Sequence, residues 1–134
     1  MGSVNQNELP HGEETILLVD DDETTLEIVT DMLSRFGYNI IRANNGESAL
    51  DFIKQEETSI HLVILDMNMP GMNGRDCLKE IKKISSQMKV IISTGDPGTI
   101  SGEKSDQDNA SGYITKPFRL QDILTQIRNV LGDK

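Results

Sequence analysis

Polar residues that could take part in chemistry follow four of the five short apolar runs in this chain. The first run ends in Asp20 and Asp21, and the third ends in Asp66. The fourth run ends in Thr94, and the fifth is followed by Lys116. Ligands of parallel sheets bind at the carboxyl ends of the strands. If the runs are parallel strands, these side chains therefore converge on one edge of a sheet.

The chemistry that suits this set of residues is phosphoryl transfer to a carboxylate. Three neighbouring carboxylates repel one another, and a hard divalent cation such as Mg²⁺ would relieve that repulsion. One aspartate could act as the nucleophile, and it needs no general base because it is already ionised at neutral pH. The lysine and the threonine hydroxyl could stabilise negative charge on the transferring oxygens.

Each of these motifs alone also has a simpler interpretation. An aspartate triplet such as 20–22 often caps a helix, where carboxylates accept hydrogen bonds from unpaired backbone N–H groups. The pair Lys116-Pro117 alone is typical of a turn. Their joint occurrence at four strand ends favours a functional site.

The elements that must position these residues alternate between strand and helix patterns. The apolar runs cover 16–19, 39–43, 62–65, 90–93 and 113–115, and the helical patterns cover 26–36, 47–56, 74–84 and 120–131. Thr24 or Asp22 is the expected N-cap of the first helix, and Gly37 ends it. The runs 16–19 and 62–65 are apolar throughout, as in strands buried on both faces. This alternation predicts an α/β fold with a parallel sheet and right-handed crossovers.

One segment departs from the alternation. Residues 96–112 read DPGTISGEKSDQDNASG, which offers few apolar side chains for a core. We therefore expect the fourth helix, which the alternation places there, to be short or disordered.

Composition narrows the classes of partner and environment. The formal net charge is −9, which argues against a nucleic-acid backbone or an anionic membrane as the main partner. The single cysteine, Cys77, excludes an intrachain disulfide, and its helical spacing predicts a buried structural thiol. Residues 1–14 are polar and read as a flexible leader, and no apolar run approaches the length of a membrane helix.

Four stretches resemble the receiver domain of two-component response regulators and hybrid histidine kinases. They are ILLVDDDE at 16–23, LVILDMNMPGMNG at 62–74, VIISTG at 90–95 and GYITKPF at 112–118. The resemblance implies that residues 15–134 form a receiver domain. It also implies a flavodoxin-like (βα)5 three-layer sandwich with a five-stranded parallel sheet in the order 2-1-3-4-5.

The resemblance assigns an acceptor and a metal site. It implies that Asp66 is the phosphoacceptor and that Asp20 and Asp21 hold Mg²⁺, with Asp21 favoured over Asp20 as the direct ligand and Mn²⁺ able to substitute. The backbone carbonyl of Asn68 is expected to bind the same ion. Asp22 extends the acidic run, and we interpret it as a cap.

The resemblance also assigns a switch. It implies that Lys116 pairs with the phosphoryl group, that the hydroxyl of Thr94 moves toward that group, and that the ring of Tyr113 then turns inward. Because residues 96–112 have weak amphipathic character, the resemblance does not identify the surface that contacts an output partner.

The function implied by the resemblance is that of a cytoplasmic signalling switch with weak self-phosphorylation and autodephosphorylation activity. Its expected phosphoryl donor is a histidine kinase or a histidine phosphotransfer protein, with no direct nucleic-acid binding and no membrane insertion. A degenerate receiver that only binds proteins is one alternative, and an aspartyl-phosphate phosphatase is another. The second lacks support because Asp66-Met67-Asn68 replaces the Asp-x-Asp loop of those enzymes. A stand-alone regulator and a fragment of a hybrid kinase both remain open.

Overall fold

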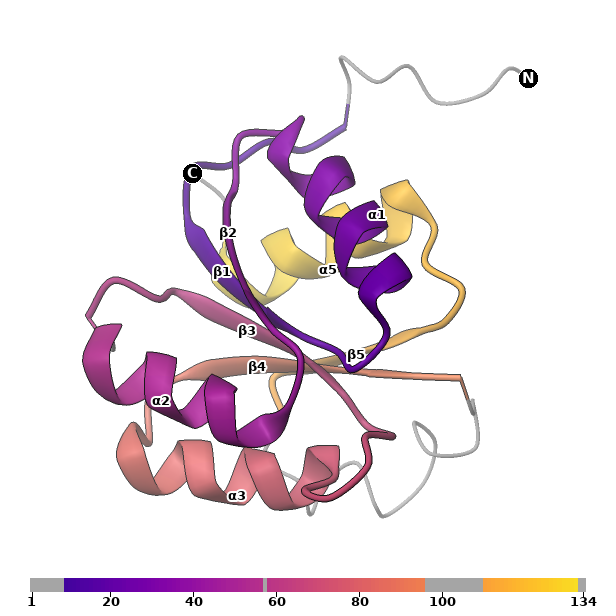
Figure 1. Ribbon diagram of the computed structural model, residues 1–134. Helices are drawn as coiled ribbons and strands as arrows, with labels where there is room; N and C mark the ends of the chain where they lie inside the picture. Colours follow the sequence, from indigo (N-terminus) through magenta and orange to yellow (C-terminus); the bar gives the residue numbers. More distant parts are fainter. Residues whose placement is uncertain (1–8, 57, 96–109, 133–134) are drawn as a thin grey trace.

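A five-stranded parallel sheet forms the centre of the chain (Figure 1). The computed structural model describes residues 9–56, 58–95 and 110–132. The strands are β1 (Thr15–Val19), β2 (Asn39–Ala43), β3 (Leu62–Asp66), β4 (Lys89–Thr94) and β5 (Gly112–Thr115). Their order in the sheet is β2-β1-β3-β4-β5, and all four neighbouring pairs are parallel, which confirms the predicted order.

Helices cover both faces of this sheet. The helices are α1 (Glu23–Ser34), α2 (Gly46–Glu56), α3 (Gly74–Ile84) and α5 (Leu120–Leu131). Figure 1 shows α1 and α5 on one face and α2 and α3 on the other, so the predicted three-layer α/β fold is confirmed. The fourth helix expected within 96–112 would fall mainly on residues 96–109, which lie outside the described part.

The core has two halves because successive side chains of a strand point to opposite faces. In β1, Leu17 and Val19 pack with α2 and α3, whereas Ile16 and Leu18 pack with α1 and α5. Cys77 of α3 is fully buried in the first half, as predicted. Among the described residues, no helix combines the length and the apolar character needed to cross a membrane.

The first helix begins and ends where the sequence indicates. Asp22 is the N-cap of α1, although its carboxylate accepts a hydrogen bond from the Thr25 hydroxyl (2.6 Å) rather than from a helix N–H group. The helix ends at Ser34, and Gly37 follows with a φ of +101°, a conformation that favours glycine. A Cβ at Gly37 would also collide with the carbonyl oxygen of Gly12.

The segment before β1 is hydrogen-bonded to the rest of the domain. The Gly12 N–H donates to the Phe36 carbonyl, and the Asn39 N–H donates to the Glu14 carbonyl, both at 3.0 Å. Arg128 of α5 donates to the Glu14 carboxylate at 2.6 Å. Residues 1–8 of the predicted leader lie outside the described part, and the predicted domain start at residue 15 stays a prediction.

Candidate functional site

The carboxylate of Asp20 is buried where the chain leaves β1. Asp20 is 2% exposed, and its backbone N–H donates to the Ala43 carbonyl at 3.1 Å, which continues the pairing of β1 with β2. The Asp22 N–H donates to Asp20 Oδ1 at 2.9 Å. The turn into α1 therefore holds this carboxylate in place at the edge of the sheet.

The second buried carboxylate belongs to Asp66, the last residue of β3. Asp66 is 3% exposed and lies beside Ser93 in the register of β3 and β4. The Asn68 N–H donates to Asp66 Oδ1 at 3.3 Å. The loop that follows folds back closely, since the Gly74 N–H donates to the Met67 carbonyl at 2.9 Å.

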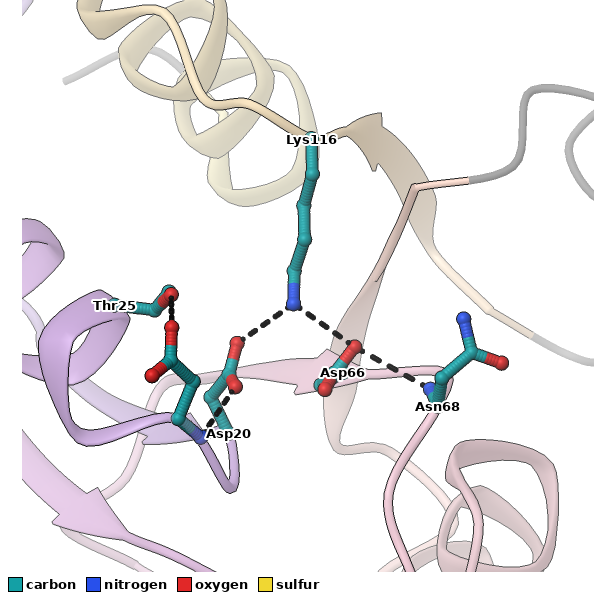
Figure 2. A network of polar contacts seen from close by, with 6 residues as sticks. Asp20, Thr25, Asp66, Asn68 and Lys116 are labelled. Carbon is teal, nitrogen blue, oxygen red and sulfur yellow. Dashed lines mark hydrogen bonds and ion pairs between the residues drawn. The ribbon is translucent and has the colours of Figure 1, made fainter.

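Lys116 joins these two carboxylates from the other side of the site. Its Nζ lies 2.9 Å from Asp20 Oδ2 and 3.1 Å from Asp66 Oδ1, and Figure 2 shows the side chain reaching between them. The Lys116 N–H donates to the Thr94 carbonyl at 2.8 Å, which anchors the base of this side chain to β4. Three strands that are distant in sequence thus place one ammonium against two buried acids.

Asp21 completes a cluster with the oxygen ligands that Mg²⁺ prefers. One carboxylate oxygen from each of Asp20, Asp21 and Asp66 lies within 4.8 Å of the others, and Asp21 is exposed to solvent. Carboxylates on one side and water on the other suit an ion that keeps several of its own waters. The residues present therefore fit a magnesium ion.

The protonation equilibria reflect an excess of negative charge. Burial raises the pKa of Asp66, the charge of Asp20 raises it further, and Lys116 only partly opposes both. Burial lowers the pKa of Lys116, but the hydrogen bond to Asp20 and the charge of Asp66 outweigh it, so this pKa lies above its usual value. One ammonium does not fully compensate the carboxylates, and a bound cation would do so.

The predicted switch residues lie on β4, which pairs with the strand of Asp66, and on β5, which pairs with β4. Thr94 is the last residue of β4 and is fully buried, one residue after the register partner of Asp66. Tyr113 lies in β5 opposite Ile92, and its ring is half-buried against the core. Their roles in switching, and that of the Asn68 carbonyl in metal binding, stay predictions.

Two contacts of the site were not predicted from sequence. The first is the ion pair of Lys116 with Asp20, which depends on the sheet order and has no local signal. The second is a hydrogen bond from Gln126 Nε2 of α5 to the Tyr113 carbonyl at 2.8 Å, which ties α5 to the predicted switch strand. Asp22 is exposed at the N-cap position of α1, and the hydrogen bond from Thr25 lowers its pKa.

A groove of about 410 Å³ opens beside the site, between α1 and the segment after β5. Lys116 lies at its edge, and its other walls are Thr25, Ile28, Val29, Met32, Pro117 and Phe118. Ile28 is 55% exposed, which makes it the large apolar side chain most open to solvent among the described residues. The groove therefore presents an apolar surface next to the carboxylates.

Comparison with known proteins gives consistent results. The profile of the response regulator receiver domain matches residues 16–128. The transcriptional regulatory protein CpxR of Escherichia coli (strain K12) is 35% identical over 116 residues, which are 87% of this chain and 48% of CpxR. The chain thus spans about half the length of this relative. Sporulation initiation phosphotransferase F of Bacillus subtilis is 33% identical over 118 residues, which are 88% of this chain and 94% of that protein.

A solved structure agrees with the fold. The CheX-CheY-BeF3-Mg²⁺ complex from Borrelia burgdorferi contains a chain that superposes with a TM-score of 0.81 and 28% identity. The superposition covers 95% of this chain and 93% of that one.

Proposed function

This chain belongs to the response regulator receiver domain family, and from that premise we propose that it is a signalling switch whose phosphoacceptor is Asp66. The observation that carries the assignment is the contact of Lys116 with both Asp20 and Asp66. Two buried acids and one lysine that meet from three strands are hard to explain as structural features, because buried charges are costly. A degenerate receiver would not need to maintain them.

The proposed reaction transfers a phosphoryl group from phosphohistidine. A carboxylate oxygen of Asp66 attacks the phosphorus, the phosphorus–nitrogen bond breaks, and the imidazole of the donor leaves as the neutral ring after taking up a proton. Lys116 moves from its contact with Asp66 to an oxygen of the transferred group, where its charge offsets the charge that develops there. The products are an acyl phosphate on Asp66 and a free histidine.

Mg²⁺, with Mn²⁺ as a substitute, is the proposed cofactor. Asp20, Asp21, Asp66 and the Asn68 carbonyl would hold it, and it would supply positive charge to the transferring oxygens. The acidic cluster and the excess of negative charge around Asp66 support this assignment. The similar Borrelia burgdorferi complex contains Mg²⁺ together with CheY.

The proposed switch begins at Thr94. Its hydroxyl would turn toward the phosphoryl oxygens, and the space it leaves would admit the ring of Tyr113. The new acyl phosphate would bias this equilibrium, so that the surface of β5 and α5 reports it to an output partner. Weak self-phosphorylation and autodephosphorylation activity in the cytoplasm complete the proposal.

The proposed donor is a histidine kinase or a histidine phosphotransfer protein that docks on the groove beside Lys116. An apolar groove that borders the carboxylates can bind the helix that presents the donor histidine. Exposed Ile28 would be central to that contact, because truncation of a central apolar side chain often weakens an interface strongly.

Incubation with acetyl phosphate and Mg²⁺, followed by intact-mass measurement, tests the acceptor. The wild-type protein should gain one phosphoryl group, hydroxylamine should remove it, and EDTA should prevent it. Asp66→Asn should gain none, whereas Asp51→Asn, which alters an exposed carboxylate on α2, should be labelled like the wild type. Equal labelling of Asp66→Asn and the wild type would show that another residue is the acceptor.

A further inference from the structure

A close contact joins the start of α2 to the loop that follows Asp66. Gly46 is the buried first residue of α2. A Cβ on Gly46 would lie 2.9 Å from the sulfur of Met72 and 3.2 Å from the Met72 Cβ. A change of rotamer can remove the sulfur but not the Cβ, so any larger residue at position 46 would also press on the backbone of Met72.

Met72 belongs to the loop that carries Asn68, and hydrogen bonds fix both ends of that loop. At its start, the Met67 N–H donates to the Ser93 carbonyl at 2.8 Å. At its end, the Gly74 N–H donates to the Met67 carbonyl at 2.9 Å, and the Asn73 side chain accepts from the Asp76 N–H at 2.9 Å. These bonds set where the loop begins and ends.

The middle of the loop depends on side-chain packing. Met69 is buried in the core, and Met72 packs against the same apolar cluster. Between them, Gly71 has a φ of +77°, and among the described residues none beyond its sequence neighbours has an atom within 4 Å of the position of a Cβ there. The loop therefore has open space beside Gly71, so few contacts there oppose a displacement of its middle part.

We propose that Gly46 is a positioning residue for the metal site. Because Gly46 has no side chain, Met72 can pack closely against the start of α2, and this packing fixes the position of the Asn68 carbonyl. This inference rests on the proposed function, in which that carbonyl binds Mg²⁺. Mg²⁺ requires nearly ideal octahedral geometry, so a small displacement of one ligand weakens its binding. Residues that orient metal ligands typically change metal affinity 10- to 100-fold when they are altered.

Titration calorimetry with MgCl2, beside urea unfolding in EDTA, tests the proposal. Gly46→Ala should raise the Kd for Mg²⁺ about tenfold. Met72→Ala, which introduces no clash, should raise the Kd by a smaller factor, because the loop loses the packing of the Met72 side chain against the core. In the double variant, alanine at position 72 keeps the Cβ that lies 3.2 Å from the new Cβ at position 46, so the Kd should stay at least as high as that of Gly46→Ala.

The matched control is Met88→Ala. Met88 is a buried methionine of the same core half, but it lies just before β4, at the opposite end of the sheet from Asp66. It should lower the urea midpoint and leave the Kd for Mg²⁺ unchanged, which separates general loss of packing from positioning. A wild-type Kd in both Gly46→Ala and Met72→Ala would overturn this inference but leave the proposed metal site intact. A wild-type protein that bound no Mg²⁺ would overturn the proposed metal site and this inference with it.

Discussion

Lys116 and Asp66 form an ion pair across the sheet, with 3.1 Å between Nζ and Oδ1. The same ammonium lies 2.9 Å from Asp20 Oδ2, so one positive charge contacts two buried acids. With the exposed Asp21 nearby, the site keeps an excess of negative charge. The charges of the proposed acceptor site are thus only partly compensated without metal, and its carboxylates fit a cation.

Replacement of Lys116 by methionine should destabilise the metal-free protein. Removal of one partner from a buried ion pair leaves an uncompensated charge, and since Lys116 is 27% exposed we expect a loss of about 2 kcal/mol in the free energy of unfolding. Excess Mg²⁺ should reduce the loss, because the cation offsets the same carboxylates. Urea unfolding with EDTA and with Mg²⁺ measures both values.

The control for this variant is Lys83→Met. Lys83 pairs with Glu80 at 3.1 Å, but their side chains are 72% and 44% exposed. Water screens such a pair, so its loss should cost less than about 0.5 kcal/mol and should not depend on Mg²⁺. Equal losses for the two variants would contradict the structural assignment of Lys116.

Mg²⁺ should stabilise the folded protein by relieving repulsion among the carboxylates. At ten times its dissociation constant, a ligand that binds only the folded state adds about 1.4 kcal/mol. Asp20→Asn removes one charge of the cluster and should abolish most of this gain. Thermal melts in Mg²⁺ and in EDTA that superimpose for the wild type would refute the metal site.

The strands and the candidate acceptor were predictable because their signals are local. Continuous apolar runs at 16–19 and 62–65 mark strands that are buried on both faces, and Asp66 follows directly in the chain. The order of the strands has no such signal. It followed from the resemblance to a family, and the structure confirms it.

Contacts between distant elements were not predictable from local patterns. Lys116 meets Asp20 only because β5 and β1 end at the same edge of the sheet. The need for glycine at position 46 arises from Met72, a neighbour in space that no helical pattern identifies. Such requirements depend on the packed backbone and become visible only in three dimensions.

The ion pair of Glu14 and Arg128 should stabilise the fold at neutral pH but not in acid. Their side chains are 16% and 8% exposed, and the Arg128 side chain donates to Glu14 at 2.6 Å. Burial raises the pKa of Glu14, but the hydrogen bond from Arg128 and nearby backbone N–H groups outweigh it and bring this pKa below its ordinary value of 4.5. The stabilisation is therefore complete above pH 4.5 and is lost as the pH falls through the lowered pKa.

Glu14→Gln measures this contribution. We expect a loss of about 2 kcal/mol at pH 7, because the variant takes the charged partner from a buried guanidinium. The difference from the wild type should narrow as the pH falls below 4.5. Asp31→Asn, which removes the exposed pair with Arg35, serves as the control and should cost less than about 0.5 kcal/mol. A Glu14→Gln difference that did not change with pH would argue against the charged pair.

The thiol of Cys77 should be unreactive in the folded protein. Burial, with smaller contributions from Glu47 and Glu80, raises its pKa to about 12. At pH 8 the thiolate fraction is then about one in ten thousand, and the sulfur has no access to solvent. Iodoacetamide should label the protein slowly without urea and rapidly in urea. Fast labelling of the folded protein would contradict the burial of this residue.

Gly74→Ala should disturb both the fold and the proposed acceptor Asp66, because the space at Gly74 is bounded by backbone. A Cβ there would lie 2.6 Å from the Asp66 carbonyl oxygen and 2.7 Å from the Met67 Cα, and neither atom can move without shifting the acceptor loop. Overpacking typically costs 1–3 kcal/mol, and the better helix propensity of alanine returns part of it, so we expect a net loss of about 2 kcal/mol. Gly95→Ala is the matched control, since within the described part of the chain no residue beyond its sequence neighbours has an atom within 4 Å of a Cβ at that position, and its stability should stay close to that of the wild type. Urea unfolding in EDTA measures the loss, and labelling by acetyl phosphate should be slower in Gly74→Ala under conditions where the variant is folded. Equal urea midpoints for Gly74→Ala and Gly95→Ala would contradict the close approach of α3 to the end of β3. They would also contradict the explanation of how the chain holds Asp66 at the edge of the sheet.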